Sequence, residues 1–361
     1  MTATEKETKL KQLHKIVDKL NKKNELRLGF GQVEPLVFIE TPFPTLNELS
    51  GGGFPRGKYT TIAGPERTAK GTLLLQTIAH SMAMDPNFTV LWTDVEDALD
   101  EPWCIALGVD MSRVLVQKYS EDATYFEKLL DAGLELIGTG AIDMWVIDSV
   151  AALIPKAEDD KLIEDNAMLD LQRKLPLFLR KGSHVISLAK TACILIGQIY
   201  NAPSATYTTE EVKGGNGLKH WAHLRLLTRR GNKQEHPDPV DIMMPDGTSR
   251  KLLPGWAMHI KNDKTRINKN EGQSIVLKFM YGRGLDSVHS AITTLFAHSV
   301  FEQSGAWFYH KALPDGKVQG KPSLVSLLES DDSLRTKLLQ ELDGELIAEF
   351  SEEDEKEPSI T

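Results

Sequence analysis

A lysine at the end of a short polar loop, between two apolar runs, is the feature of this sequence with the clearest chemistry. The first apolar run is residues 59–63 and the second is residues 73–75. The backbone N–H groups of such a loop and the positive end of a following helix can hold phosphate oxygens, and the lysine can reach the outer phosphates. The spacing predicts a strand, a phosphate-binding loop and a helix. The candidate phosphate ligands are Gly64, Pro65, Glu66, Arg67, Thr68, Ala69, Lys70, Gly71 and Thr72.

The loop departs from the usual phosphate-binding pattern on both sides of the lysine. The pattern has Gly before the lysine and Ser or Thr after it, whereas this chain has Ala69 and Gly71. The hydroxyl that normally contacts a magnesium ion is therefore missing. Thr72 lies one residue later and is turned by about 100° around a helix, so it replaces that hydroxyl only if the loop shifts. The motif by itself also fits an ordinary strand-to-helix turn.

Carboxylates follow two other apolar runs that we expect to be strands. Asp148 comes directly after residues 144–147, and Asp94 and Glu96 follow residues 90–92. In open α/β sheets ligands bind at the carboxyl ends of the strands. A carboxylate there suits a water-mediated magnesium contact or can orient a water for attack on a phosphate. A lone acid at a strand end is usually a helix cap or solvated, but two such strands beside the loop favour a nucleotide site.

The hydrophobic pattern predicts an α/β fold with a largely parallel sheet. Between about residues 35 and 285, short β-rich runs alternate with helical stretches. The expected strands are residues 59–63, 88–92, 144–147 and 194–196. After Gly284 the pattern becomes helical again, at residues 291–301 and 324–346, with a Gly/Pro-rich turn region near residues 314–322 between them. We expect a small C-terminal domain there.

The first segment predicts an amphipathic helix. Apolar residues recur at helical spacing in a lysine-rich background. They are Leu10, Leu13, Ile16, Val17 and Leu20. The helix must bury this stripe, either on its own domain or on a neighbouring subunit.

Several separate motifs in this chain resemble the RecA recombinase family, including its phage-encoded UvsX-type members. The resemblance extends over nearly the whole chain and follows the family's order. The motifs are Gly64-Pro65-Glu66, Glu96-Asp97-Ala98-Leu99-Asp100, Ile147 to Leu153, Pro155-Lys156-Ala157-Glu158, Gln198, Gly214-Gly215-Asn216, Tyr281-Gly282-Arg283-Gly284 and Gly305-Ala306-Trp307. The resemblance implies a RecA-like P-loop ATPase core that uses ATP and Mg²⁺.

The resemblance also implies roles for single residues of the nucleotide site. Lys70 matches the phosphate-binding lysine, Glu96 the general base that activates water, and Asp148 the magnesium-associated carboxylate. Asp100 and Trp103 match the adenine contacts, although a buried tryptophan is more commonly part of a core.

Three further residues match positions that respond to the terminal phosphate. Gln198 resembles the residue that senses the γ phosphate and passes the signal to the following loop. Lys264 and Arg266 stand where family filaments present two cations to the nucleotide of a neighbouring subunit. The family pattern has lysine at both positions, and arginine still supplies positive charge.

Two segments, residues 155–168 and 199–213, resemble the DNA-binding loops of the family. Apolar or aromatic side chains between bases, with basic groups on phosphates, give binding that tolerates any sequence. Arg173 and Arg180, seven residues apart on one helix face, match family arginines that contact the DNA backbone, although a surface salt-bridge pair also fits them. The other candidate DNA-binding residues are Met168, Tyr200, Tyr207 and Lys213.

The resemblance implies a division of the chain and a set of partners. Residues 1–34 would be an oligomerisation arm, 35–285 the ATPase core, 286–349 a small C-terminal domain and 350–361 an acidic tail. The partners would be single-stranded DNA, homologous duplex DNA, further copies in a helical filament, and mediator and single-strand-binding proteins. The segment 231–255 is longer than in bacterial relatives, and the sequence assigns it no role.

The charge pattern does not by itself decide whether the chain binds nucleic acid. The formal net charge of the 361 residues is −9, which alone argues against a nucleic-acid ligand. However, acidic residues gather at 352–357 and basic residues near 11–27, 173–181 and 225–233, although ordinary solvated surfaces fit this pattern as well.

The same properties argue against a secreted or membrane protein. Two cysteines are too few for a disulfide framework, and no apolar run reaches the roughly 18 residues of a membrane span. We expect a cytoplasmic protein without a membrane partner, acting in the bacterial host if phage-encoded.

The sequence predicts an ATP-dependent protein that forms filaments on single-stranded DNA and promotes strand exchange in recombination and repair. Gly71 keeps open an alternative, an accessory or structural filament protein of the same fold with little ATP hydrolysis. A hexameric helicase-type motor is a more remote alternative, since residues 155–158 and 305–307 resemble recombinases.

Overall fold

The computed structural model describes residues 3–22, 34–120, 125–155, 168–203, 208–212, 216–243 and 248–354. The chain divides into two units, residues 1–37 and 38–361. The first unit contains the helix α1 (Ala3–Lys22), as the apolar spacing predicts. Leu10, Leu13 and Ile16 of its apolar stripe are exposed.

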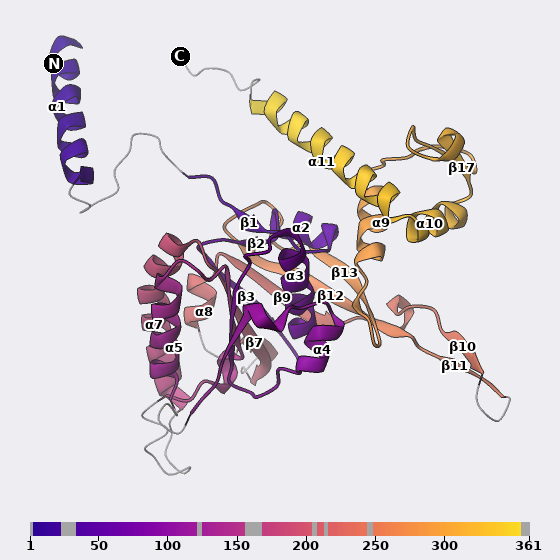
Figure 1. Cartoon of the computed structure of the whole chain (residues 1–361), viewed down its shortest axis with the longest axis horizontal. Coiled ribbons are helices and arrows are strands. Elements are labelled where there is room, and N and C mark those ends of the chain that lie inside the picture. The colour runs from indigo at the N-terminus through magenta and orange to yellow at the C-terminus, as the bar shows by residue number, and fades with distance from the viewer. Residues whose placement is uncertain are drawn as a thin grey trace. The chain divides into compact units, whose positions relative to one another are not determined.

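The second unit is built on one large, mostly parallel sheet (Figure 1). Its strand order is β14-β13-β12-β9-β3-β7-β6-β4-β5, and β8 pairs with β7. The strands from β9 to β5 along this order are parallel, whereas β12, β13 and β14 extend the sheet antiparallel. Their bounds are β3 (Tyr59–Gly64), β4 (Val90–Asp94), β5 (Val114–Gln117), β6 (Met144–Asp148), β7 (Ala192–Pro203), β8 (Thr208–Val212), β9 (Leu224–Arg230), β12 (Gly255–Thr265), β13 (Ser274–Met280) and β14 (Gly284–Leu285).

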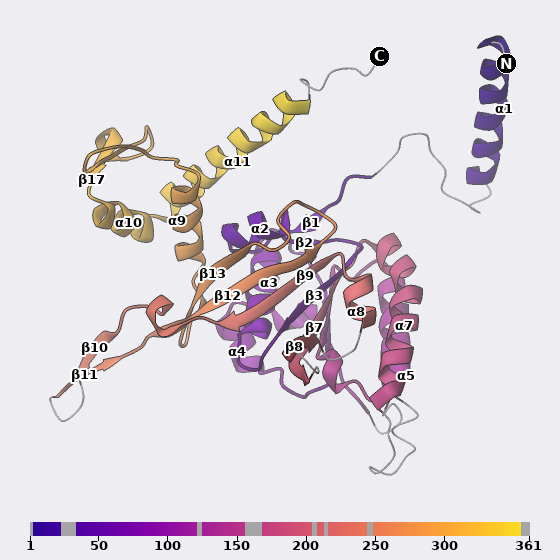
Figure 2. The same ribbon diagram turned by 180° about the vertical axis from the view of Figure 1, so that it is seen from behind.

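Helices cover both faces of this sheet (Figures 1 and 2). One face carries α2 (Pro44–Ser50), α3 (Lys70–Met84) and α4 (Glu101–Ala106), and the other carries α5 (Phe126–Gly138), α7 (Met168–Ala189) and α8 (Asn216–Trp221). Short 3-10 helices lie at Met111–Arg113, Val150–Ala152, Lys233–Glu235 and Pro314–Gly316, and β1 (Phe38–Ile39) pairs with β2 (Phe54–Pro55).

The alternation of side chains along the strands explains why the expected strands are continuous apolar runs. Successive residues of a strand point to opposite faces, so a strand that is covered on both sides needs apolar residues at every position. On β4, Trp92 packs in the core beneath α3, while Leu91 packs in the core beneath α5 and α7. Ile194 and Leu195 of β7 divide in the same way.

Residues from Ser287 onward build a separate hydrophobic cluster around Leu295, Phe308, Leu324 and Leu338. It contains the helices α9 (Ser287–Ala297), α10 (Lys321–Ser330) and α11 (Asp332–Asp354), near the expected helices. The sequence did not predict the three-stranded antiparallel sheet between α9 and α10, whose last strand lies in the expected turn region near residues 314–322. Its strands are β15 (Glu302–Ser304), β16 (Trp307–Tyr309) and β17 (Lys317–Gln319).

The segment 231–255 contains an antiparallel hairpin of β10 (Val240–Met243) and β11 (Ser249–Leu252), which extends beyond the large sheet (Figure 1). None of the helices in the described part of the chain has the length and apolar character needed to cross a bilayer.

The expected α/β class and the four expected strands are confirmed. The segment 199–213 differs from the expected loop, because β7 continues to Pro203 and pairs antiparallel with β8 from Ile199↔Val212 to Pro203↔Thr208. Backbone hydrogen bonds between these strands replace the loop in the described part of the segment. The segment 156–167 lies outside the described residues. The domain boundaries near residues 35, 286 and 350 stay predictions.

The close packing of α5 against the sheet can be tested at two glycines of this helix. A Cβ at Gly133 would lie 2.5 Å from Cζ2 of Trp145, whereas a Cβ at Gly138 on the same helix meets no atom within 4 Å. Gly133→Ala should lower the free energy of unfolding by roughly 1–3 kcal/mol, because overpacking outweighs the gain in helix propensity. Gly138→Ala should be neutral or stabilising by up to about 0.5 kcal/mol. Urea unfolding of both variants measures this, and equal effects would contradict the packing.

Candidate nucleotide site

The register of the parallel strands brings the candidate residues together at one edge of the sheet. Gly64 at the end of β3 pairs with Gln198 on β7, and Asp94 at the end of β4 pairs with Asp148 at the end of β6. Gly64, Asp94 and Asp148 are at carboxyl ends of strands, where open α/β sheets bind ligands, and Gln198 lies at the same level of the longer strand β7.

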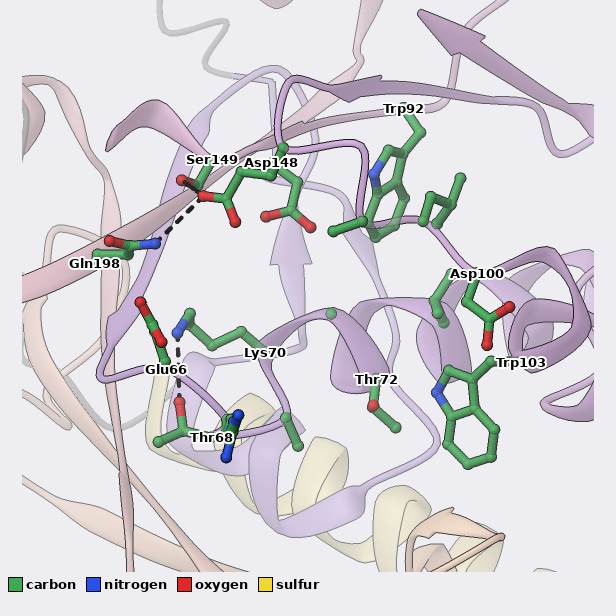
Figure 3. A pocket seen from close by; sticks show the side chains of 17 residues that line it. Glu66, Thr68, Lys70, Thr72, Trp92, Asp100, Trp103, Asp148, Ser149 and Gln198 are labelled. Atoms are coloured by element: carbon green, nitrogen blue, oxygen red, sulfur yellow. Dashed lines mark hydrogen bonds between the residues drawn. The ribbon is translucent and has the colours of Figure 1, made fainter. Parts of the chain in front are cut away.

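A cavity of about 520 Å³ lies along this edge, between the loop that follows β3 and the segment that follows β4 (Figure 3). Its lining combines the loop, the carboxylates and two aromatic side chains. The lining residues are Glu66, Arg67, Thr68, Ala69, Lys70, Gly71, Thr72, Leu75, Trp92, Glu96, Ala98, Leu99, Asp100, Trp103, Asp148, Ser149 and Gln198.

The loop makes its tight turn through two residues in the left-handed region. Arg67 has φ 57°, and Ala69, which precedes α3, has φ 59°. A side chain in this conformation costs roughly 1–2 kcal/mol, which is why the usual pattern has glycine before the lysine. Ala69 nevertheless adopts the glycine-type conformation, so the loop keeps its turn despite the departure in sequence.

The ammonium group of Lys70 is held inside this turn. The side chain is 9% exposed, and Nζ donates to the carbonyl oxygens of Gly64 at 3.0 Å and Pro65 at 2.7 Å. Burial lowers the pKa of Lys70, while Asp148 and the other nearby acids act in the opposite direction. Lys70 is thus a partly desolvated cation at the N-terminus of α3. Both the cation and the helix N-terminus favour binding of a phosphate oxygen.

Gly71 and Thr72 leave the position beside the lysine without a hydroxyl. A Cβ at Gly71 would meet no atom within 4 Å, so the backbone has room for a side chain there. Figure 3 shows Thr72 on the side of Trp103 and Asp148 across the cavity. The structure does not bring the two candidate magnesium ligands, Thr72 and Asp148, together.

Glu96 is positioned by two neighbours. Ser149 Oγ and Gln198 Nε2 both donate to Glu96 Oε1, the second at 3.3 Å. Asp94 has a different role, because its two carboxylate oxygens accept from the backbone N–H groups of Ala98 and Leu99 at 3.0 and 3.1 Å. Asp94 therefore shapes the segment that carries Glu96. Sequence reasoning overlooked Ser149, whose position directly after Asp148 was the available signal.

Asp148 is a carboxyl group in an unfavourable environment for negative charge. Burial, together with the nearby charges of Glu96 and Asp94, raises its pKa to about 7, and Lys70 opposes the shift. A bound cation would favour the charged carboxylate.

The residues around this cavity fit a magnesium ion that is bound together with a nucleotide. In the described part of the chain no cluster of three or more His, Cys, Asp or Glu side chains could hold a metal ion. Mg²⁺ in nucleotide sites is typically held by one or two carboxylates, substrate phosphates and waters. Asp148 would be the protein ligand, acting directly or through water, and Gly71 contributes no side-chain oxygen.

The other end of the cavity is suited to a flat ring. Trp103 on α4 is partly buried, and Asp100 precedes the helix with an exposed carboxylate. Both lie on the side of the cavity away from Lys70 (Figure 3). An aromatic face beside a carboxylate can stack on a base and accept a hydrogen bond from it.

Lys264 and Arg266 do not line this cavity. They donate to the backbone carbonyl oxygens of Lys219 and His220, respectively. Partial burial and the neighbouring Arg266 and Lys219 lower the pKa of Lys264. The expectation that these residues face the nucleotide of another subunit stays a prediction.

Of the candidate DNA-binding residues, Arg173 and Arg180 are exposed on α7. Met168 begins α7 and Tyr200 lies on β7. Tyr207 and Lys213 are outside the described residues.

Comparison with known proteins agrees with the fold, which has the architecture of a P-loop α/β core. The chain belongs to the RecA family, since residues 7–249 match the model of the RecA N-terminal domain. It is 32% identical to Protein RecA of Thermus aquaticus over 311 residues, which cover 84% of this chain and 85% of that protein. It is 28% identical to Protein RecA of Acinetobacter baylyi over 356 residues, which cover 96% of each chain.

The raised pKa of Asp148 predicts a pH dependence of stability. The folded protein holds the Asp148 proton more tightly than the unfolded chain, so this contribution to stability is present in acid and is lost as the pH rises towards about 7. Asp148→Asn removes the cost of the buried charge. Relative to the wild type, its free energy of unfolding should rise by on the order of 2–4 kcal/mol between about pH 4 and pH 8. Urea unfolding across this range measures the difference, and parallel pH profiles would contradict it.

Proposed function

We propose that this RecA-family protein is an ATP-dependent protein of DNA recombination and repair that assembles on single-stranded DNA and promotes strand exchange. The observation that carries the proposal is the cavity that Lys70, Glu96, Asp148 and Gln198 line together at the carboxyl edge of the sheet. It offers a cation and backbone donors at one end and an aromatic ring at the other, which matches the charges and shape of a nucleoside triphosphate.

ATP binding follows from the two ends of the cavity. The β and γ phosphates would replace the carbonyl groups of Gly64 and Pro65 as hydrogen-bond acceptors of Lys70 Nζ. An anion is a better partner for a buried ammonium group than a neutral carbonyl is. The loop N–H groups would hold the remaining oxygens. Adenine would lie against Trp103, with Asp100 as its polar contact.

Hydrolysis would depend on Glu96, whose carboxylate accepts the proton of the attacking water. Ser149 and Gln198 hold Glu96 through one oxygen, which leaves Oε2 for the water. Gln198 donates a hydrogen bond to Glu96 and directly precedes Ile199, where β7 begins to pair with β8. A γ phosphate that moves Gln198 would therefore also move the β7–β8 hairpin, which is a candidate DNA-binding segment. Mg²⁺ bound with ATP would neutralise charge on the phosphates, and Asp148 would hold it there.

DNA binding would involve α7 and the two adjacent segments. Arg173 and Arg180 would contact phosphates, and residues 155–168 and 199–213, including Met168, Tyr200, Tyr207 and Lys213, would contact the bases and backbone. Homologous pairing would then be specified by the DNA bases themselves.

Assembly into a filament would use the exposed apolar residues of α1 on a neighbouring copy. Lys264 and Arg266 would reach the neighbour's ATP. The acidic tail after residue 350 would compete with DNA for basic surface. Mediator and single-strand-binding proteins are further expected partners, and the cytoplasm is the expected location.

The missing hydroxyl at Gly71 predicts that ATP binding and hydrolysis separate. Lys70 and the loop amides still hold the phosphates, so the wild type should bind ATP but hydrolyse it slowly. Gly71→Thr should raise kcat by about tenfold, because the open space beside Gly71 accepts the side chain and its hydroxyl can position the metal. Glu96→Gln should lower the remaining turnover about 100-fold and leave ATP binding intact. Calorimetric binding and phosphate release with DNA measure both quantities.

Gly71→Ala is the matched control, since it adds a Cβ without a hydroxyl and should not accelerate turnover. Rapid wild-type hydrolysis would show that another group replaces the hydroxyl. No ATP binding at millimolar concentration would overturn the nucleotide proposal.

Single-strand binding should tolerate any sequence and weaken steeply with salt, because bound phosphates release counterions. Arg173→Ala or Arg180→Ala should weaken it about 5- to 10-fold and reduce the slope against log salt by about 0.7 each. Lys337→Ala, which removes an equal charge from the exposed surface of α11, is the control. Fluorescence anisotropy with unrelated oligonucleotides, beside electron microscopy of the same samples, tests binding and filament formation. Normal binding by both arginine variants would rule out this face of α7.

A further inference from the structure

Two buried threonine hydroxyls connect the phosphate loop to a strand outside the cavity. Thr68 of the loop is 2% exposed and Thr228 of β9 is 0% exposed. Their Oγ1 atoms are 2.8 Å apart, which is a hydrogen-bond distance. Thr68 lines the cavity, whereas Thr228 lies behind the loop and is not among the lining residues.

Counting the protons gives this bond a direction. Thr68 Oγ1 donates its single proton to the carbonyl oxygen of Pro65 at 2.9 Å. The bond between the two hydroxyls therefore uses the proton of Thr228, and Thr68 is the acceptor. The alternative acceptor for Thr228, the carbonyl oxygen of Ala63, is at 3.4 Å and is less favourable. Lys70 Nζ also lies 3.5 Å from Thr68 Oγ1 (Figure 3).

The first glycine of the loop makes room for this arrangement. β3 and β9 are parallel neighbours with Ala63 opposite Leu227, so Thr228 follows directly beside Gly64. A Cβ at Gly64 would overlap the Thr228 hydroxyl and its carbonyl group. Because it has no side chain, Gly64 allows β9 to approach the loop closely.

We propose that Thr228 is a positioning residue for the phosphate loop, acting through Thr68, and this inference rests on the proposed nucleotide function. When a phosphate draws Lys70 away from the carbonyls of Gly64 and Pro65, the loop loses two of its internal hydrogen bonds. The Thr228 hydroxyl bond does not involve Lys70 and lies behind the loop, so it remains. It keeps the loop amides in the orientation that receives the phosphates and reduces the ordering that ATP must impose.

Removal of this one hydroxyl tests the inference in the full chain, by calorimetric titration with ATP and steady-state hydrolysis. Thr228→Val, which keeps the shape of the side chain, should weaken ATP binding about 3- to 10-fold, the range that one hydrogen bond supplies. It should raise KM by a similar factor and leave kcat within about twofold, because Glu96 and its partners are untouched. Thr228→Ser keeps the donor and should retain wild-type affinity.

Thr60→Val is the matched control. Thr60 is a fully buried threonine on the neighbouring strand β3, and its Oγ1 has no hydrogen-bond partner among the described residues. This variant makes the same chemical change and should leave ATP affinity unaltered. Thr68→Val removes the acceptor, and in the double variant Thr68→Val/Thr228→Val the second substitution should add little to the first.

The outcomes separate this inference from the proposed function. A wild type that binds ATP together with an unaffected Thr228→Val overturns the inference alone, as does equal weakening by Thr60→Val. A wild type that binds no ATP overturns the proposed function and, with it, the inference. If Thr228→Val fails to fold, Thr68→Val tests the same bond from its other side, and unaltered ATP affinity in that variant overturns the inference.

Discussion

The buried ammonium group of Lys70 is the constraint on which the rest of the site depends. A cation that is 9% exposed must have polar partners, because transfer of an unpaired charge out of water is costly. The carbonyl groups of Gly64 and Pro65 supply them, and the loop that brings them to the lysine turns through left-handed residues, including Ala69. The strain at Ala69 thus occurs in a loop whose carbonyl groups bind a buried charge.

The acids across the cavity form the opposite half of the same electrostatic arrangement. Asp148 and Asp94 are side by side because their strands are in register, and Glu96 lies close enough to raise the pKa of Asp148 further. Asp94 is stabilised by two backbone N–H groups. Lys70 offsets part of this concentration of negative charge. The cavity therefore favours a cation on the side of the acids and phosphate on the side of Lys70.

The scaffold that holds these groups is a sheet covered on both faces. Buried strands allow little adjustment, because interiors are closely packed and a strand that slipped by one residue would exchange its two apolar faces. Trp145 shows how tightly this holds, since its indole packs against Gly133 on one side while its N–H donates to Thr93 at 2.8 Å. Such packing fixes the positions of the strands, and hence the spacing of Gly64, Asp148 and Gln198, without any direct contact with a ligand.

The sequence by itself determined the N-terminal helix, four of the buried strands and the candidate chemistry. The continuous apolar runs indicated strands that are buried on both faces, and the loop around Lys70 indicated a phosphate site even though Ala69 and Gly71 depart from the pattern. These features are local, since they depend on residues that are neighbours along the chain. The roles of the site residues and the DNA-binding segments remain predictions of the same local patterns and of family resemblance.

Only the tertiary structure decided which distant residues meet. The contact between Thr68 and Thr228 depends on β9 lying beside β3, and the support of Glu96 by Ser149 and Gln198 depends on β4, β6 and β7 being neighbours in the sheet. The same holds for the pairing of β7 with β8 and for the small C-terminal sheet, whose short strands have too few residues for a clear alternation. Strand order and register arise from packing between segments far apart in the chain, and no local pattern in a single sequence encodes them.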